Sequence, residues 1–172
     1  MTTRLEPRTV RDSGVELARV MTQHDANAIG NVHGGVIMHE VDTAAGMAAA
    51  RHASRVAVTA SIDELSFLAP VHIGDVLVVK AAVNDVGRTS LEVGVRVEAE
   101  RWDGAERRHT TSAYLVMVAI DAEGHPAEIP PVIAESDDER RRQGQARIRR
   151  QVRKERIARL GAWRPEPVNT EA

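Results

Sequence analysis

The feature that most restricts the fold of this chain is a run of strict alternation between residues 91 and 100. Apolar Leu91, Val93, Val95, Val97 and Ala99 alternate with Glu92, Gly94, Arg96, Glu98 and Glu100. Because successive side chains of a β-strand point to opposite faces, this two-residue period predicts a strand. One face of the strand is predicted to be buried, and the other is predicted to face water.

Further strands are predicted on both sides of this run. Segments rich in β-branched residues lie at 56–68, 75–86 and 107–121, and short turns lie at 72–75, 85–88 and 102–104. Because short turns join antiparallel neighbours, these strands predict an antiparallel sheet. Residues 15–22 are predicted to form an additional short strand at the start.

An alanine-rich segment with helical spacing separates the first strand from the others. Its apolar positions form two adjacent stripes, Ile37, Val41, Ala44, Ala45 and Ala48 in one and Met38, Ala45 and Ala49 in the other. Alanine is the best helix former, and Gly46 adds to a thin helix that can lie close to a sheet. Two stripes predict a helix that is wrapped by the sheet. The fold class is therefore α+β, with one helix against an antiparallel sheet.

Composition excludes several classes of protein. The length of 172 residues fits one domain with an extension, and the core must rely on Val, Ala, Ile and Leu because aromatic residues make up only 2%. A net charge of −2 argues against a nucleic-acid partner. The absence of cysteine excludes disulfides, thiolate catalysis and thiolate metal sites. No membrane-length apolar run and no signal-peptide pattern are present, which predicts a cytoplasmic protein without a membrane partner.

Shifts in composition divide the chain into three predicted parts. Residues 1–13 are polar and are expected to be a flexible N-terminus, and residues 14–125 are expected to form the domain. Residues 126–172 read as a proline-rich linker followed by a charged helical tail. The helix expected at 137–160 lacks a sustained apolar stripe, so it is predicted to be mostly solvated or to lie against a partner subunit. Residues beyond 162 are expected to be loose.

The arginine-rich part of the tail has two interpretations. Its cations are Arg140, Arg141, Arg142, Arg147, Arg149, Arg150, Arg153 and Lys154. A charge run of this kind is usually a solvated face, and contact with RNA or with coenzyme A phosphates is the alternative.

The candidate chemistry lies between Asp25 and Asp42. Gly34 and Gly35 open the predicted helix, where free backbone N–H groups meet the positive end of the helix dipole. Without side chains at these positions, a ligand oxygen can approach closely, and such N-termini bind anions or stabilise the oxyanion of acyl transfer. Asp42 follows about two turns later on the stripe of Met38. A carboxylate on an apolar stripe costs free energy unless it is paired with another group or takes part in the function.

These residues carry a resemblance to a known family. HGGVIMHEVD at 33–42, preceded by DANAIGNV and followed by VTASIDELSFLAPVHIGD, resembles the acyl-CoA thioesterases of the hotdog superfamily. It is similar to the brain-type and long-chain acyl-CoA hydrolases and to their bacterial relatives, from about Val20 to about Asp121. The resemblance implies a long central helix wrapped by a five- or six-stranded antiparallel sheet. It also implies edge-to-edge pairing into dimers, which commonly assemble into hexamers as trimers of dimers.

The resemblance further implies an active site shared by two subunits. Asp42 corresponds to the catalytic acid, Asn27 to its partner from the other subunit, and the N–H of Gly35 to the group that polarises the thioester carbonyl. Asn31 is the alternative to Asn27. The residues implied in binding the substrate or its coenzyme A part are His33, Gly34, Thr59, Ala60, Ser61, Arg88, Thr89 and Ser90.

Each assignment has a structural alternative. Asn27 can be a turn residue that bonds its own backbone, and His33 can be a helix cap. The glycine pair can serve only a tight turn. Asp42 can be a buried carboxylate with a structural partner. Thr59 and Ser61 can be ordinary polar strand residues, and Arg88 a solvated cation.

The implied reaction is hydrolysis of acyl-CoA to a carboxylic acid and coenzyme A, with Asp42 acting as general base for water or as nucleophile. No cofactor is expected. No metal is expected either, because His33 and His39 do not share ligand spacing with acidic residues.

Two other functions compete with hydrolysis. An acyl-CoA sensor that controls transcription would need a helix-turn-helix segment, for which too few residues precede the motif. A hotdog hydratase or dehydratase would pair His33 with Asp42, but the FLAPVHIGD context favours hydrolysis.

Overall fold

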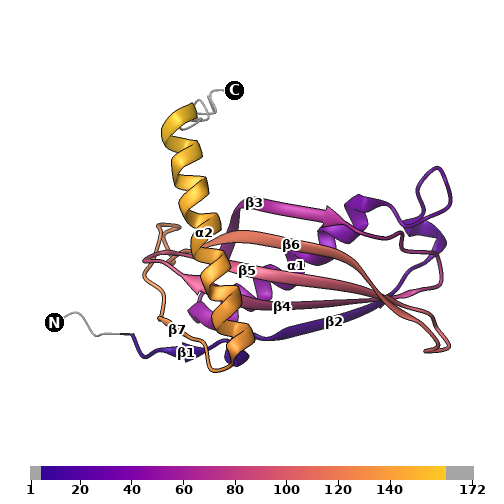
Figure 1. The fold of residues 1–172 in the computed structure, drawn as a ribbon, viewed down its shortest axis with the longest axis horizontal. Coiled ribbons are helices and arrows are strands. Elements are labelled where there is room, and N and C mark those ends of the chain that lie inside the picture. Colours follow the sequence, from indigo (N-terminus) through magenta and orange to yellow (C-terminus); the bar gives the residue numbers. More distant parts are fainter. Residues whose placement is uncertain (1–4, 162–172) are drawn as a thin grey trace.

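Five antiparallel strands form the main sheet in the computed structural model, which describes residues 5–161 (Figure 1). Their order across the sheet is β2 (Val15–Val20), β4 (Val76–Val86), β5 (Ser90–Glu100), β6 (Arg107–Ala119) and β3 (Ala57–Phe67). The predicted strands are confirmed, with ends that differ by at most two residues. β2 and β3 are the outer strands, so each presents one edge without a neighbour in this sheet.

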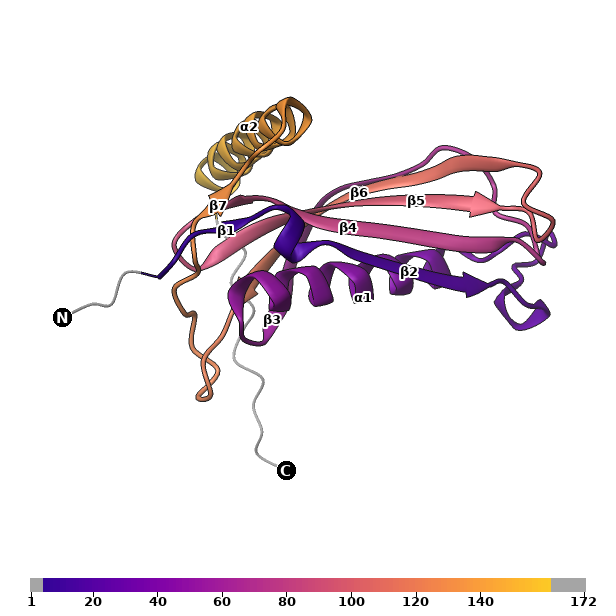
Figure 2. The same ribbon diagram turned by 90° about the horizontal axis from the view of Figure 1, so that it is seen from below.

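Helix α1 (Gly34–Ala53) lies along one face of the sheet (Figure 2). Its buried side chains are Ile37, Val41, Ala44, Ala45, Ala48, Ala49, His52 and Ala53. The small side chains allow the close approach that the sequence predicts: a Cβ added at Gly46 would lie 4.0 Å from Cε of Met117 on β6. Both predicted stripes contribute to the contact, but Met38 at the start of the second remains 42% exposed. One flank of α1 is therefore open.

The prediction for the alternating strand is right for one face and wrong for part of the other. Leu91, Val93, Val95, Val97 and Ala99 are all buried against α1. Glu92, on the face expected to meet water, is only 3% exposed. It is buried because helix α2 (Asp137–Leu160) crosses this outer face of the sheet.

Helix α2 has the bounds that the sequence predicts, but it is not only a solvated helix. Ser136 caps its N-terminus by accepting a hydrogen bond from the N–H of Glu139, and the Glu139 carboxylate accepts in return from the N–H of Ser136. Most of the helix is exposed. Ala146 is buried, however, and arginines on the same side bind carboxylates of its own sheet.

Part of the segment expected to be flexible belongs to the fold instead. Strand β1 (Arg8–Thr9) pairs in parallel with β7 (Val132–Ile133), and a short 3₁₀ helix, η1 (Arg11–Ser13), follows. The hydroxyl of Ser13 donates to the carbonyl of Val10 and accepts from the N–H of Val83 on β4. These contacts tie the residues before the domain to the linker after it. The expectation for residues beyond 162 lies outside the described residues.

Candidate active site

Asp42 lies on the open flank of α1, beside the edge strand β3. Its side chain is exposed, and its Oδ1 accepts a hydrogen bond of 2.5 Å from the hydroxyl of Thr59. The same hydroxyl lies 3.4 Å from the sulfur of Met117. In the single chain, Asp42 is therefore exposed, and its side-chain partner is the Thr59 hydroxyl rather than an arginine or a backbone turn. A single chain presents Asp42 at its surface, next to the free edge of the sheet.

A bulge in β3 aims Thr59 at this carboxylate. Thr59 pairs with Met117 and Ser61 pairs with Val116, so Ala60 is an extra residue without a partner. Paired residues share a face of the sheet. Met117 faces α1, whereas its neighbour Val116 faces the opposite side, and so Thr59 and Ser61 point to opposite faces. The predicted group of Thr59, Ala60 and Ser61 is thus divided, and only Thr59 contacts Asp42.

At the N-terminus of α1, the His33 side chain accepts a hydrogen bond from the N–H of Gly35, the donor that is predicted to bind the substrate carbonyl. Nδ1 of its exposed ring accepts a hydrogen bond of 2.9 Å from the N–H of Gly35. Its carbonyl oxygen accepts from the N–H of Val36 at 2.9 Å. His33 is therefore the N-cap of the helix, as its structural interpretation predicts. Packing leaves little room for a side chain at Gly34, since a Cβ there would lie 3.2 Å from the ring of Phe67.

Asn27 organises the loop that precedes the helix. Its Oδ1 accepts hydrogen bonds from the N–H groups of Ile29, at 3.0 Å, and Asn31, at 3.1 Å. Among residues 5–161, its Nδ2 group has no acceptor. Oδ1 of Asn31 lies 3.0 Å from Nδ1 of His72. Both asparagines thus have structural contacts, and the amide donor of Asn27 is available to another molecule.

An open hollow of about 430 Å³ joins this loop to the helix N-terminus. Polar groups of Asn27, Asn31 and Gly34 lie on its wall, and the rest of its lining is apolar: Val32, Ile37, Phe67, Leu68, Ala69, Pro70 and Val71. Asp42 does not line it. Because an α-helix rises 1.5 Å per residue, Gly35 and Asp42 are about 10 Å apart along the helix axis. One chain therefore holds two separate parts of the predicted site.

Arg88 and Thr89 lie in the turn between β4 and β5, and Ser90 is the first residue of β5. The N–H of Gly87 donates to the carbonyl of Ser90 at 2.7 Å, and the Arg88 guanidinium lies 3.9 Å from the Glu128 carboxylate. Ser90 pairs with Val118 of β6, which pairs in turn with Val58 of β3. The turn is thus at the Thr59 end of the sheet, about 10 Å from β3.

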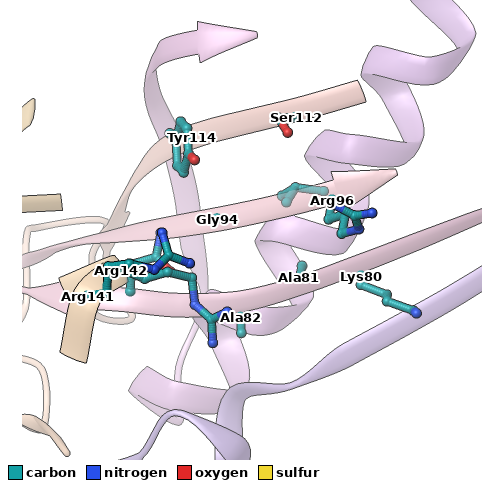
Figure 3. A pocket seen from close by; sticks show the side chains of 11 residues that line it. Lys80, Ala81, Ala82, Gly94, Arg96, Ser112, Tyr114, Arg141 and Arg142 are labelled. Atoms are coloured by element: carbon teal, nitrogen blue, oxygen red, sulfur yellow. The ribbon is translucent and has the colours of Figure 1, made fainter. Parts of the chain in front are cut away.

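A second hollow, of about 370 Å³, lies on the outer face of the sheet beside the start of α2 (Figure 3). Four cations line it, but each is paired with an acidic side chain. Lys80 and Arg96 bind Glu98, while Arg141 and Arg142 bind Asp138. This hollow lies on the face away from Asp42 and is not part of the candidate site.

Comparison with known proteins identifies the family. Residues 29–102 match the family model described as 4HBT, Thioesterase superfamily. The chain is 34% identical over 134 residues to the uncharacterized acyl-CoA thioester hydrolase YkhA of Bacillus subtilis, with 78% of each chain covered. The chain belongs to the thioesterase superfamily, among its acyl-CoA hydrolases.

Solved structures of this superfamily confirm the hotdog fold. A hexameric acyl-CoA thioesterase superposes with a TM-score of 0.86 at 35% identity, covering 90% of this chain and 99% of the other. The acyl-CoA hydrolase of Staphylococcus aureus gives a TM-score of 0.83 at 31% identity, with 89% and 93% covered. The cytosolic acyl coenzyme A thioester hydrolase of Rattus norvegicus is 34% identical over 80% of this chain. This chain spans about a third of the length of that mammalian relative (36%).

Sequence reasoning missed one buried carboxylate near the candidate site. Asp25 is 4% exposed and binds Arg19 at 2.6 Å, while Arg19 also binds Glu40 of α1 at 2.8 Å. Hydrogen bonds from Thr22, the backbone N–H first, lower the pKa of Asp25 below its usual value. Together these contacts join the Asn27 loop to α1. The spacing of Thr22 and Asp25 is a capping-box pattern, and this pattern in the sequence could have indicated the contact between them.

Proposed function

We propose that this chain hydrolyses acyl-CoA thioesters to carboxylic acids and coenzyme A, in active sites that two copies of the chain share. The observation that carries this proposal is the Thr59–Asp42 hydrogen bond on an exposed flank beside the unpaired edge of β3. The S. aureus relative was crystallised with butyryl coenzyme A and coenzyme A, which supports the same class of substrate here. A relative described as cytosolic supports a cytoplasmic location.

Residue spacing supports the assignment of three side chains. The S. aureus hydrolase has been solved as single alanine variants of an asparagine, an aspartate and a threonine, separated by 15 and then 17 positions. Asn27, Asp42 and Thr59 have the same two separations. We therefore assign Asp42 as the catalytic acid and Asn27 as its partner, in preference to Asn31. Thr59 is assigned as the residue that positions Asp42.

The length of α1 supports a shared site. A thioester carbonyl bound at Gly35 is about 10 Å from Asp42 of the same chain, whereas a general base must lie within hydrogen-bond reach, directly or through one water. Asp42 must therefore act with the helix N-terminus of another copy. The free edge of β3 has unpaired backbone groups that suit antiparallel pairing with a second β3. A hexameric relative supports further assembly as a trimer of dimers.

In the proposed reaction, Asp42 removes a proton from water, and the oxygen of that water attacks the thioester carbon. Asn27 of the partner subunit donates through Nδ2 to the water or to the carbonyl oxygen. The N–H of the partner's Gly35 stabilises the oxyanion once the carbonyl oxygen has replaced the ring of the partner's His33 as its acceptor. The C–S bond then breaks, and protonated Asp42 returns its proton to the departing sulfur, so that coenzyme A leaves as the thiol. The alternative route, in which Asp42 attacks as nucleophile, uses the same groups.

The other residues that are predicted to bind coenzyme A differ in how well their positions suit that contact. Arg88, Thr89 and Ser90 are proposed to contact its phosphates or pantetheine, because they lie at the Thr59 end of the sheet and Arg88 is exposed. Ser61 points to the other face, which argues against its contact with substrate. The hydratase alternative has little support, because His33 caps α1 and lies nine residues from Asp42 in the same chain.

The test is release of free thiol from a panel of acyl-CoAs, from acetyl to palmitoyl. Asp42→Ala is expected to lower kcat by about 10²- to 10⁴-fold without unfolding the chain, because the side chain is exposed. Thr43→Ala, at the next exposed position of α1, is the matched control and should retain activity. Near-wild-type turnover by Asp42→Ala, or no thiol release by the wild-type chain from any acyl-CoA, would contradict the proposal.

A further inference from the structure

Helix α2 is attached to the sheet by a series of arginine contacts that crosses it strand by strand. On β4, Asp85 lies 3.5 Å from Arg147 and 3.0 Å from Arg150. Arg149 contacts the next two strands: it lies 2.7 Å from Glu92 on β5 and 3.6 Å above the Tyr114 ring on β6. On β3, Asp63 binds Arg153. Asp85 and Glu92 are each only 3% exposed. The helix therefore has a defined direction, from β4 to β3.

The contact with β3 is the last one that the chain's own sheet provides. Asp63 reaches α2 from a second bulge, where the register of β3 shifts between Ile62 and Glu64. Residues 154–160 continue past this outermost strand, and Figure 1 shows α2 extending beyond β3. Seven residues of helix span about 10 Å, which equals about two strand spacings. A second sheet placed at the β3 edge would lie beneath them.

The projecting turns have the character of a docking surface. Ile157 is 46% exposed and Leu160 is 79% exposed, although both are large apolar side chains. Lys154, Arg156 and Arg159 outweigh the single carboxylate of Glu155. Exposed apolar side chains of this size fit an apolar partner surface.

The outer face near the β3 edge offers such a surface. Exposed Glu64 pairs with Tyr114 and therefore points to the outer face. Between β3 and α2 lies a groove of about 240 Å³, where the exposed side chains of Ile148 and Val152 lie beside Asp63, Glu64 and three arginines of α2: Arg149, Arg153 and Arg156. Ile148 and Val152 are one helical turn apart, so they present one apolar strip toward the sheet edge.

We infer that residues 154–160 dock on the outer sheet face of a second copy of this chain, near Glu64 and the groove of the partner subunit. This inference rests on the edge-to-edge pairing in the proposed function. Two-fold symmetry makes the contact reciprocal, so each α2 contacts the sheets of both subunits. Because each active site takes groups from both copies, the two α2 helices stabilise the catalytic arrangement although they lie on the opposite face of the sheet.

Disulfide cross-linking tests the contact, and the absence of native cysteine provides a clean background. A Leu160→Cys chain and a Glu64→Cys chain with tags of different mass are co-expressed, and the assembled protein is oxidised. A disulfide between the two tagged chains is expected. Arg140→Cys, at the other end of α2, replaces Leu160→Cys in the control and should give none.

Sedimentation of the unmodified chain separates the two possible failures. A dimer or larger assembly without the cross-link would overturn the inference alone. A chain that stays monomeric at all concentrations would overturn both the inference and the shared active site.

Dilution of a charged variant provides a functional test. Changing Ile157 and Leu160 together to Lys should weaken dimerisation by at least about tenfold, because two apolar side chains lose their burial. Specific activity should then fall on dilution and recover at high protein concentration, whereas the wild-type activity stays constant. Gln151→Lys adds charge to an exposed position within the part of α2 above the sheet, and it should behave as wild type. An activity of the double variant that does not change on dilution would also overturn the inference.

Discussion

The hydrogen bond between Thr59 and Asp42 is the residue-level feature on which the candidate site depends. A hydroxyl that donates to a carboxylate fixes which oxygen faces the substrate and which rotamer the acid adopts. The geometry requires the bulge at Ala60, because a regular strand would give Thr59 and Ser61 the same face. Thr59 is therefore assigned to the acid, although the sequence suggested a contact with coenzyme A.

Replacing Thr59 separates its hydroxyl from its shape. Thr59→Val keeps the branched side chain and should lower kcat by about 10- to 100-fold, because a hydrogen bond to a charged group is lost. Thr59→Ser restores the donor and should recover most of that rate. Thiol-release kinetics measure both variants, with the thermal midpoint as a control for folding. Equal activity of the Val and Ser variants would show that the hydroxyl has no role.

His52 is a second residue whose environment has a measurable effect. It is fully buried in α1, with Nε2 donating to the carbonyl of Pro130 at 3.0 Å, and its Nδ1 has no partner among the described residues. Burial, the largest effect, lowers the pKa of His52 below its ordinary value of 6.5. The unfolded chain therefore binds a proton at a higher pH than the folded chain does.

Stability should consequently decrease on mild acidification. The contribution of His52 is complete above pH 6.5 and is lost as the pH falls from there through the lower folded pKa, by at most about 1.4 kcal/mol per pH unit. Urea unfolding between pH 7.5 and 5.5 measures this slope. His52→Gln should reduce the slope, whereas His125→Gln, at an exposed turn, should leave it unchanged. A slope that is the same in all three proteins would contradict this role.

At the level of elements, α2 is attached through buried charge where the sequence offered no apolar stripe. Glu92 accepts hydrogen bonds from Arg149 at 2.7 Å and from Nδ2 of Asn84 at 3.0 Å. A buried ion pair adds little net stability over apolar packing, but the loss of one partner leaves an uncompensated charge. The helix should therefore be sensitive to single changes in these carboxylates.

Removal of Glu92 tests this attachment. Glu92→Ala should reduce the free energy of unfolding by about 3 kcal/mol, because Arg149 is then held over the sheet without its counter-charge. Glu100→Ala, on the same strand, removes a carboxylate 3.6 Å from Arg107 in a more exposed pair and should cost less than about 1 kcal/mol. Guanidinium unfolding monitored by circular dichroism compares the two variants. Equal losses would mean that burial of Glu92 has no special importance.

At the level of the whole molecule, the proposed active site exists only between two chains. Asn27→Ala and Asp42→Ala chains should each be inactive alone, because every site then lacks one group. In a mixed dimer, one site contains both changes and the other contains neither. Random mixing should therefore restore about a quarter of the wild-type activity. Thiol release after co-refolding measures the recovery, and its complete absence would contradict cross-subunit pairing.

Periodicity and local chemistry determined most of the fold from the sequence alone. The two-residue alternation of 91–100, the short turns and the alanine-rich helix depend on interactions between near neighbours, and so their element types and bounds agree with the structure. The match of HGG, Asp42 and the flanking segments to acyl-CoA hydrolases likewise needs no coordinates.

Only the tertiary structure decided how the elements meet. It showed Asp42 exposed beside Thr59, Gly35 bonded to His33, and Glu92 buried under α2. None of these contacts follows from a periodic pattern in the sequence. A one-residue bulge reverses the face to which a side chain points. A helix some 50 residues later covers a strand whose alternation predicts one solvated face. Local spacing determines which side chains share a surface, whereas long-range packing determines what covers that surface.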